Sequence, residues 1–314
     1  MKILVTIGLM MSLLFCVGCS DPQTGILNPP TAWKTLTSGK PQALLGVSFI
    51  DNSKGWISGA GGTILYTLDG GNSWSTQFSG TTKFIRDIYF IDEMTGTSVG
   101  ESGLILRTTN GGGSWITQTS GTTEHLTHVY FFNSLVGMAT GQNGTILKTV
   151  NGGTNWIKQN TGVSVEITCV FMMSETAAVA TGSGGLILRT IDGGNNWVPV
   201  ASGITSNLRG VSFSGSNGIA VGLGGKILRS SNGGQSWLSV TSGVNNDLYA
   251  VQYADANFVF ICGTVIVLTA SDSGNDFTYS STPNIVGNLY AISMKSGRGW
   301  TVGDNGMLFT YFPL

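Results

Sequence analysis

Acidic and amide side chains recur at one place in a glycine-rich turn, where they could bind a metal or act as catalytic acids. The series is Asp69, Asn110, Asn151, Asp192, Asn232 and, in a degenerate copy, Asp272. In a turn, both Asp and Asn accept hydrogen bonds from nearby backbone amides. A catalytic site does not need six copies of one residue. The recurrence therefore predicts that these residues cap turns, and we expect no metal and no catalytic group among them.

An aromatic residue closes each of these turns and gives the chain its period. The closing residues are Trp74, Trp115, Trp156, Trp197, Trp237 and Phe277, separated by 41, 41, 41, 40 and 40 positions. A fixed period of this length is typical of a repeat architecture. A unit of about forty residues cannot bury a core alone, so the repeats are expected to form one domain. The closing tryptophans should then be structural residues buried between units.

Each unit contains short apolar or β-branched runs, which in the second unit lie at residues 85–90, 96–100, 104–108 and 115–118. Such runs, bounded by Gly, Asn, Asp and Ser, predict strands. Four of them per repeat predict a four-stranded antiparallel propeller blade. Gly100 and Gly103 flank the link between the second and third runs, where a tight turn favours positive φ. The sixth unit departs from this rule, because Thr264-Val265-Ile266 follows Gly263 without a second glycine.

The number of blades follows from the first strand, which occurs seven times, beginning near Leu44, Ile85, Leu126, Ile167, Leu208, Leu248 and Leu289. The last unit stops after its third strand, whereas Trp33 lies 41 residues before Trp74. The N-terminal strand should therefore complete the last blade and close the ring. We predict an all-β, seven-bladed β-propeller at residues 31–314. A six-bladed alternative would leave Trp33 and the final apolar run without partners.

The turn resembles the Asp-box, or BNR-type, repeat, whose pattern is Ser/Thr-x-Asp-x-Gly-x-x-Trp. With Gly-x-x-Gly-x-Ile-Leu-Arg-Thr before the box, the chain resembles the photosystem II stability/assembly factor-like propellers over Trp33 to Leu314. The resemblance implies a propeller that binds assembling membrane proteins through a surface that includes arginines. Because the repeats are regular and lack obvious inserted loops, we expect a non-photosynthetic bacterial member. In sialidases, which share this box, it lies on the face away from the active site.

The N-terminus has the features of an export signal. Lys2 precedes an apolar run at residues 3–17, too short to be a preferred membrane span. The run ends in Cys16-Val17-Gly18-Cys19-Ser20, which resembles a bacterial lipobox. We expect a lipoprotein signal peptide at 1–18, lipidation of Cys19 and a proline-containing tether at 19–30. Export and a lipid anchor in the cell envelope follow, at the outer membrane or cell surface in a Gram-negative cell. An ordinary secretory signal or a retained signal anchor are the alternatives.

Composition excludes several classes of partner. The formal net charge is -1 and charged residues make up 10% of the chain, with no basic stripe, so nucleic acid is not an expected partner. The two histidines do not form a zinc motif with other ligands, and we expect no metal and no cofactor. Cys169 and Cys262 occupy different places in their repeats, so buried free thiols are expected rather than a disulfide.

Candidate binding residues are found where the copies disagree. The second and third places of the first strand vary most, and they lie near the mouth of a propeller's central channel. Arg86, His128, Arg209, Tyr249 and Tyr290 are the candidates for partner binding. Alternatively they fill the channel, or pair with Asp87 and Glu101. We expect a monomeric, non-catalytic propeller that binds another envelope or membrane protein. A sialidase-like glycan-binding or glycan-hydrolysing propeller is the alternative.

Overall fold

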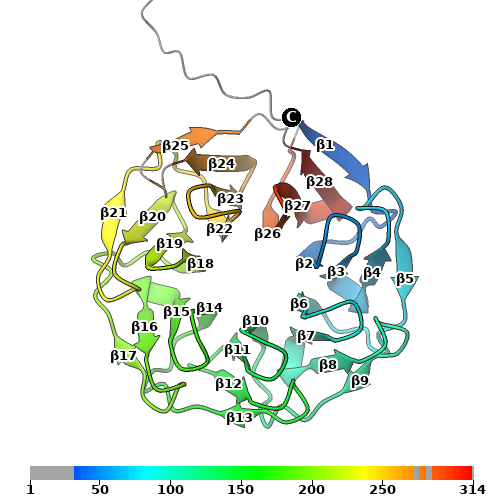
Figure 1. The fold of residues 1–314 in the computed structure, drawn as a ribbon, viewed down its shortest axis with the longest axis horizontal. Helices are drawn as coiled ribbons and strands as arrows, with labels where there is room; N and C mark the ends of the chain where they lie inside the picture. The colour runs from blue at the N-terminus through cyan, green and yellow to red at the C-terminus, as the bar shows by residue number, and fades with distance from the viewer. Residues whose placement is uncertain (1–31, 272–273, 275, 281–284, 313–314) are drawn as a thin grey trace, which may run out of the picture.

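The computed structural model describes residues 32–271, 274, 276–280 and 285–312. This part of the chain forms a ring of seven four-stranded antiparallel sheets, as Figure 1 shows. The predicted all-β, seven-bladed propeller is therefore confirmed. The signal segment, Cys19, the tether and Asp272 lie outside the described residues. No helix within the described ranges is long and apolar enough to cross a membrane.

Each blade contributes one strand to each of four concentric layers. The innermost strands are β2 (Leu44–Phe49), β6 (Ile85–Phe90), β10 (Leu126–Phe131), β14 (Ile167–Met172), β18 (Leu208–Ser214), β22 (Leu248–Tyr253) and β26 (Leu289–Lys295). The second strands are β3 (Gly55–Gly59), β7 (Gly96–Gly100), β11 (Gly137–Gly141), β15 (Ala178–Gly182), β19 (Asn217–Gly222), β23 (Val259–Gly263) and β27 (Arg298–Gly303). The third strands are β4 (Ile64–Thr67), β8 (Ile105–Thr108), β12 (Ile146–Thr149), β16 (Ile187–Thr190), β20 (Lys226–Ser230), β24 (Ile266–Ser271) and β28 (Met307–Phe312). The outermost strands are β5 (Ser75–Gln77), β9 (Ile116–Thr117), β13 (Ile157–Lys158), β17 (Val198–Pro199), β21 (Leu238–Val240), β25 (Asp276–Tyr279) and β1 (Ala32–Thr37).

The chain ends meet in blade seven, where β1 pairs antiparallel with β28. Trp33 is opposite Tyr311 in this register, and six residue pairs join the two strands. The Trp33 indole N–H also donates to the Ser280 hydroxyl at 2.9 Å, in the neighbouring blade six. The predicted closure of the ring by the N-terminal strand is thus confirmed. Figure 1 shows β1 and β28 side by side.

The core lies between neighbouring blades rather than within one sheet. Trp300 of blade seven stacks on Phe49 of blade one at 3.6 Å between ring centroids. Trp56 of blade one stacks on Phe90 of blade two at 3.5 Å. Both tryptophans are 0% exposed, so packing accounts for their shared place in the repeat. Blades are therefore held together by burial of large apolar surfaces at each junction.

The closing tryptophans contribute to the same junctions to different extents. Trp33, Trp156, Trp197 and Trp237 are buried, whereas Trp74 and Trp115 are half-buried. Trp156 meets the edge of Phe131 at 5.9 Å, and its indole N–H donates to the Gly153 carbonyl. The structure places Trp115 just before β9, so the outer strand is shorter than the predicted 115–118 run. The residue closes the turn instead of joining the strand ladder.

The glycine rule between the second and third strands has two separate causes. The second glycine behaves as predicted, since Gly103 has φ +70° in the short 3₁₀ turn η2 (Glu101–Gly103). Related turns are η1 (Ala60–Gly62), η3 (Ser183–Gly185) and η4 (Asp304–Gly306). The first glycine does not behave as predicted, because Gly100 has φ -172°, which is an extended conformation and not a positive φ. A Cβ at Gly100 would lie 2.1 Å from the Phe84 carbonyl oxygen, so close approach of the backbone requires it.

Blade six has a tighter link because it lacks the second glycine. Gly263 pairs directly with Ile266, and Val265 adopts φ 59° in the turn. Positive φ is unfavourable for a β-branched residue. The turn is supported from blade seven, where the Gly287 carbonyl accepts from the Val265 N–H at 2.9 Å. Thr264 also forms an isolated bridge with Asn288. The neighbouring blade thus holds a conformation that the local sequence disfavours.

The Asp-box residues cap their turns, as predicted. Asp69 accepts hydrogen bonds from the Ser73 N–H at 2.9 Å and the Thr67 hydroxyl at 2.8 Å. Asn110 accepts from the Ser114 N–H at 2.9 Å in the same way. Hydrogen bonds from Ser73 lower the pKa of Asp69 to about 2. These side chains are occupied by their own turns, which leaves function to other parts of the ring.

A second repeated contact joins three of the boxes to the preceding blade. The Arg107 Nε donates to the Gly152 carbonyl of the next blade at 2.6 Å. Lys148 donates to the Gly193 carbonyl at 2.7 Å, and Arg189 Nε donates to the Gly233 carbonyl at 2.9 Å. The cation at the end of the third strand in blades two to four therefore links each of them to the next blade.

Candidate functional site

The inner strands line a central cavity of about 440 Å³. Every one of the seven inner strands has a register shift between its first and third residues, for example between Ile85 and Asp87 in β6. The second residue is therefore bulged out of the ladder, and a bulge re-aims its side chain. These bulged residues are Leu45, Arg86, Thr127, Thr168, Arg209, Tyr249 and Tyr290. They are called the bulge ring below.

Two threonines of the bulge ring are used to join blades. The Thr127 hydroxyl donates to the Ile167 carbonyl at 2.9 Å, and the Thr168 hydroxyl donates to the Leu208 carbonyl at 2.8 Å. The other five residues do not make this contact between blades. Four of those five, Arg86, Arg209, Tyr249 and Tyr290, are residues predicted from the sequence. The bulge ring thus brings four of the five candidate residues onto one ring around the cavity.

The two arginines hold incompletely neutralised charge. Arg86 Nη2 lies 3.9 Å from Glu101 Oε1, and Arg209 Nη1 lies 3.4 Å from Glu166 Oε2. The buried Nε atoms of both arginines have no hydrogen-bond partner among the described residues. A guanidinium can donate through all of its N–H groups to a planar acceptor such as a carboxylate. Both arginines therefore retain capacity to bind an acidic group.

The two tyrosines form a pair at the junction of blades six and seven. Their ring centroids are 5.5 Å apart in a tilted arrangement. The Tyr290 hydroxyl donates to Asp304 Oδ1 at 2.8 Å, and the Thr264 hydroxyl is 3.4 Å from the Tyr249 hydroxyl. Burial, followed by the hydrogen bond to Asp304, raises the pKa of Tyr290. The pair is an aromatic surface on the same bulge ring as the arginines.

His128 lies one residue further along its strand than the other candidates. Its Nε2 is 3.7 Å from Asp87 Oδ2, and its Nδ1 accepts a long hydrogen bond from the Val170 N–H at 3.5 Å. Asp87 Oδ2 in turn accepts from the Val129 N–H at 3.0 Å. The structure therefore places His128 on the channel wall, in contact with Asp87, instead of at the mouth with the arginines. The expected alternative pairing is seen only for Arg86 with Glu101, because Asp87 pairs with His128.

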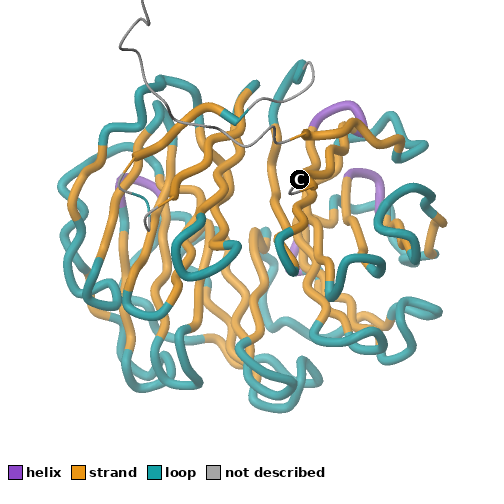
Figure 2. The backbone as a smooth tube through the Cα atoms, turned by 45° about the horizontal axis from the view of Figure 1, so that its top comes forward, coloured by secondary structure: helices purple, strands orange, loops and turns teal. Residues whose placement is uncertain are grey.

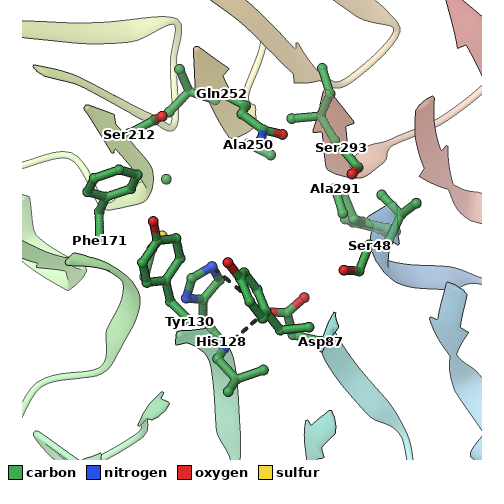
Figure 3. A pocket seen from close by; sticks show the side chains of 18 of the residues that line it. Ser48, Asp87, His128, Tyr130, Phe171, Ser212, Ala250, Gln252, Ala291 and Ser293 are labelled. Carbon is green, nitrogen blue, oxygen red and sulfur yellow. Dashed lines mark hydrogen bonds and ion pairs between the residues drawn. The ribbon is translucent and has the colours of Figure 1, made fainter. Parts of the chain in front are cut away.

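A second set of cavity-lining side chains, at the fifth place of the inner strands, was not identified from the sequence. At the fifth place of the inner strands, blades two to four carry Tyr89, Tyr130 and Phe171, whose adjacent centroids are 5.4 and 4.9 Å apart. The remaining blades carry Ser48, Ser212, Gln252 and Ser293, each of which accepts a hydrogen bond from a backbone N–H of the next inner strand. Figure 3 shows Tyr130 and Phe171 apart from the polar Gln252 and Ser293. Alignment of the fifth place would have revealed this division.

The cavity is lined by side chains of several chemical types. Within the described ranges, no group of three or more His, Cys, Asp and Glu residues could hold a metal ion. Cys169 and Cys262 are both free and buried, as predicted. The cavity combines cationic, aromatic and polar walls, which suits binding of a polar, partly aromatic segment.

Part of the chain matches a known family model. Residues 76–197 match the family model described as photosynthesis system II assembly factor YCF48. The chain is similar to photosystem II assembly factor-like β-propellers. The predicted resemblance is therefore confirmed. A comparison with curated proteins gives no sequence match.

Solved structures agree on the propeller's architecture. The structure titled YCF48 bound to D1 peptide is 22% identical, with a TM-score of 0.74, and the match covers 89% of this chain and 94% of that one. YCF48 from Cyanidioschyzon merolae is 21% identical, with a TM-score of 0.72 and coverage of 90% and 99%. The WD40 β-propeller domain of Doa1 is 14% identical, yet reaches a TM-score of 0.76 with coverage of 90% and 98%. Similarity of the ring is shared by proteins of different repeat type, so it shows the fold alone.

Proposed function

We propose that this propeller is a non-catalytic, lipid-anchored protein-binding factor that assists assembly or stability of a membrane-associated complex in the bacterial cell envelope. The match to the photosystem II assembly factor type supports a role in protein assembly. A D1 peptide is named as the ligand of one similar structure, which makes a peptide segment a reasonable ligand class here. The anchor rests on the lipobox around Cys19 and is part of the proposal.

One structural observation carries the proposed site. Arg86 and Arg209 lie on the bulge ring with weakly engaged guanidinium groups, and the Tyr249–Tyr290 pair lies on the same ring. Arginine and tyrosine are the residue types that contribute most to protein interfaces. We infer a partner segment that presents a carboxylate to the arginines and an apolar or aromatic side chain to the tyrosines. Arg86 and Arg209 would disfavour segments that place basic residues at those positions.

A pull-down from envelope extracts tests this site. We expect the triple variant Arg86→Gln/Arg209→Gln/Tyr249→Leu to recover its partner at least about tenfold less than wild type, since lost charged and aromatic contacts cost about 1–3 kcal/mol each. The matched control is Lys34→Gln/Lys158→Gln, which removes two exposed charges from outer strands. Recovery of every partner equally by the two variants would remove the proposed site.

Two further measurements address the other parts of the proposal. A fatty-acid label incorporated by wild type and lost in Cys19→Ala would support the anchor, and equal labelling of both would contradict it. Turnover of a sialoside or another glycan by the purified protein would overturn the non-catalytic assignment. These results are independent of the pull-down, so the site, the anchor and the absence of catalysis can fail separately.

A further inference from the structure

At the fifth place of the inner strands, the central cavity has two chemically different walls. The aromatic wall belongs to blades two to four and consists of Tyr89, Tyr130 and Phe171. The polar wall belongs to the remaining blades and consists of Ser48, Ser212, Gln252 and Ser293. Figure 3 shows Tyr130 and Phe171 across open space from Ser293. A molecule between the two walls would meet aromatic rings on one side and hydrogen-bonding groups on the other.

The polar wall has its acceptors occupied and its donors free. Each of its four side chains accepts a backbone N–H of the next inner strand, at 2.9–3.2 Å. Within the described ranges, none of the three serine hydroxyls and neither N–H of the Gln252 amide donates to a protein acceptor. The serines are more than nine-tenths buried, so their hydroxyl hydrogens must find acceptors inside the cavity. A ligand that fills this place therefore needs acceptor atoms.

The aromatic wall adds two more free donors. The hydroxyls of Tyr89 and Tyr130 have no hydrogen-bond partner in the part of the chain that the structure describes. Burial raises the pKa of both hydroxyls, to about 12 for Tyr89, so both keep their proton at neutral pH. Adjacent ring centroids along the wall are 5.4 and 4.9 Å apart, which forms a continuous surface for a planar ring.

Positive charge predominates in the cavity lining. Arg86, Arg209 and Lys295 line the cavity, and Asp87 is the carboxylate among the described residues that do so. Asp87 Oδ2 is engaged by the wall, since it accepts a backbone N–H at 3.0 Å and lies 3.7 Å from His128 Nε2. The glutamates that approach the two arginines are not part of the lining. This excess of cations favours an anionic ligand.

The bulge ring and the two walls are separated by a length that a small molecule can bridge. Arg86 at the second place and Tyr89 at the fifth belong to the same strand, β6. A strand rises about 3.3 Å per residue, so the two places are about 10 Å apart. Figure 2 shows the strands running between loops at the two faces of the ring, so this spacing lies along the depth of the channel. The cavity volume of about 440 Å³ is typical of a small-molecule pocket.

A polypeptide is a poor match for the space between the walls. Every peptide residue except proline brings a backbone N–H donor, and the side chains of both walls already hold unpaired donors. Donors buried against donors stay unsatisfied, which weakens binding. A planar molecule whose polar atoms are oxygens accepts hydrogen bonds from both walls. The chemistry of the walls therefore favours a small, acceptor-rich aromatic molecule over a protein segment.

We propose that the channel binds a small aromatic carboxylic acid, with its ring against the aromatic wall and its carboxylate held by the arginines of the bulge ring. Arg86 lies in blade two and Arg209 in blade five, so the two arginines flank the aromatic wall. An oxygen at the far end of the ring accepts hydrogen bonds from Gln252 and the serines of the polar wall. This site needs no protein partner and thus goes beyond the proposed function, although it uses the same two arginines.

Isothermal titration calorimetry of the purified full-length protein with 4-hydroxycinnamate tests the site. This probe carries a ring hydroxyl and a carboxylate at opposite ends. We expect saturable binding with a Kd below about 1 mM. The amide 4-hydroxycinnamamide lacks the negative charge and should bind at least about tenfold more weakly. Absence of saturable binding by 4-hydroxycinnamate, or equal affinity for the acid and the amide, overturns the proposal. Both measurements use wild type, so they do not depend on the folding of a variant.

Two variants locate the ligand in the channel. Phe171→Leu removes one ring of the aromatic wall and should weaken binding of 4-hydroxycinnamate about fivefold or more. Gln252→Glu keeps an acceptor for the Met294 N–H but removes the amide donor, and should weaken binding to a similar extent. The matched control Phe78→Leu changes a ring that is 87% exposed and outside the cavity lining, and should alter the affinity less than about twofold.

Thermal melts establish that each variant is folded before its affinity is compared. Equal affinities of folded Phe171→Leu and Phe78→Leu, or an unchanged affinity of folded Gln252→Glu, overturn the proposal. The titrations contain no protein partner, so they can fail while the pull-down succeeds, and the reverse.

Discussion

Replacement of Trp33 by alanine should loosen the closure of the ring. The indole is 5% exposed, lies 6.2 Å from Phe260 and 5.5 Å from Tyr311 between ring centroids, and donates to Ser280 at 2.9 Å. Truncation of a buried tryptophan costs about 3–5 kcal/mol, which combines lost burial with the cavity left behind. In a chain of this size, 1 kcal/mol corresponds to about 2 °C in Tm. We therefore expect the Tm of Trp33→Ala to fall by about 6–10 °C.

Thermal melts followed by circular dichroism would measure this loss, and hydrogen exchange would locate it. The matched control is Lys34→Ala, which changes the exposed neighbour in the same strand and should alter stability by less than about 0.5 kcal/mol. Faster exchange should be concentrated in β28, because its outer edge is covered by β1. A loss below about 1 kcal/mol, or a melt indistinguishable from that of Lys34→Ala, would show that Trp33 does not hold the closure.

Three further substitutions test other parts of the ring. Arg107→Met keeps the apolar stem but removes the 2.6 Å hydrogen bond to the Gly152 carbonyl. It should lower the free energy of unfolding, measured in urea, by about 1–2 kcal/mol after allowance for partial exposure. A loss equal to that of the exposed Lys158→Met variant would refute this prediction. Hydrogen bonds from Ser73 lower the pKa of Asp69 from 3.8 to about 2, so their stabilisation is present above pH 3.8 and is lost as pH falls toward 2. The Tm advantage of wild type over Asp69→Asn should shrink across that window, and a constant difference would contradict the assignment. Val265→Asn should stabilise the protein by about 1 kcal/mol, since Asn tolerates the observed φ of 59°; urea melts showing destabilisation would count against strain at this turn.

The fold was predictable because the repeat itself encodes it. The spacing of Trp74, Trp115 and Trp156 sets the blade length, and the match of Trp33 to the same series identifies the closing strand. Both features depend on local residue types at fixed intervals. For Gly100 the predicted reason, a positive φ, was wrong. Glycine is needed there because the backbone passes close to the Phe84 carbonyl, and that approach arises only when the strands are folded together.

The candidate site was predictable only in part. Variation at the second place of the inner strand identified Arg86, Arg209, Tyr249 and Tyr290, because a place that does not support the blades is free to differ. The bulge that turns these side chains into the cavity has no residue signature in the sequence. His128 was grouped with them, although its contacts are with Asp87 and the Val170 backbone. Contacts between residues 41 positions apart depend on how neighbouring blades pack, and one repeat considered alone cannot show them.

The position of β1 also has a mechanical consequence. A pull on the chain at Ala32 is transmitted directly to the six-pair contact between β1 and β28. If the protein is tethered through its N-terminus, any drag from a bound partner is carried by the same strand that keeps the two chain ends together. Attachment and ring integrity then depend on one mechanical element, and force sufficient to peel β1 away would open blade seven before it reached any other blade.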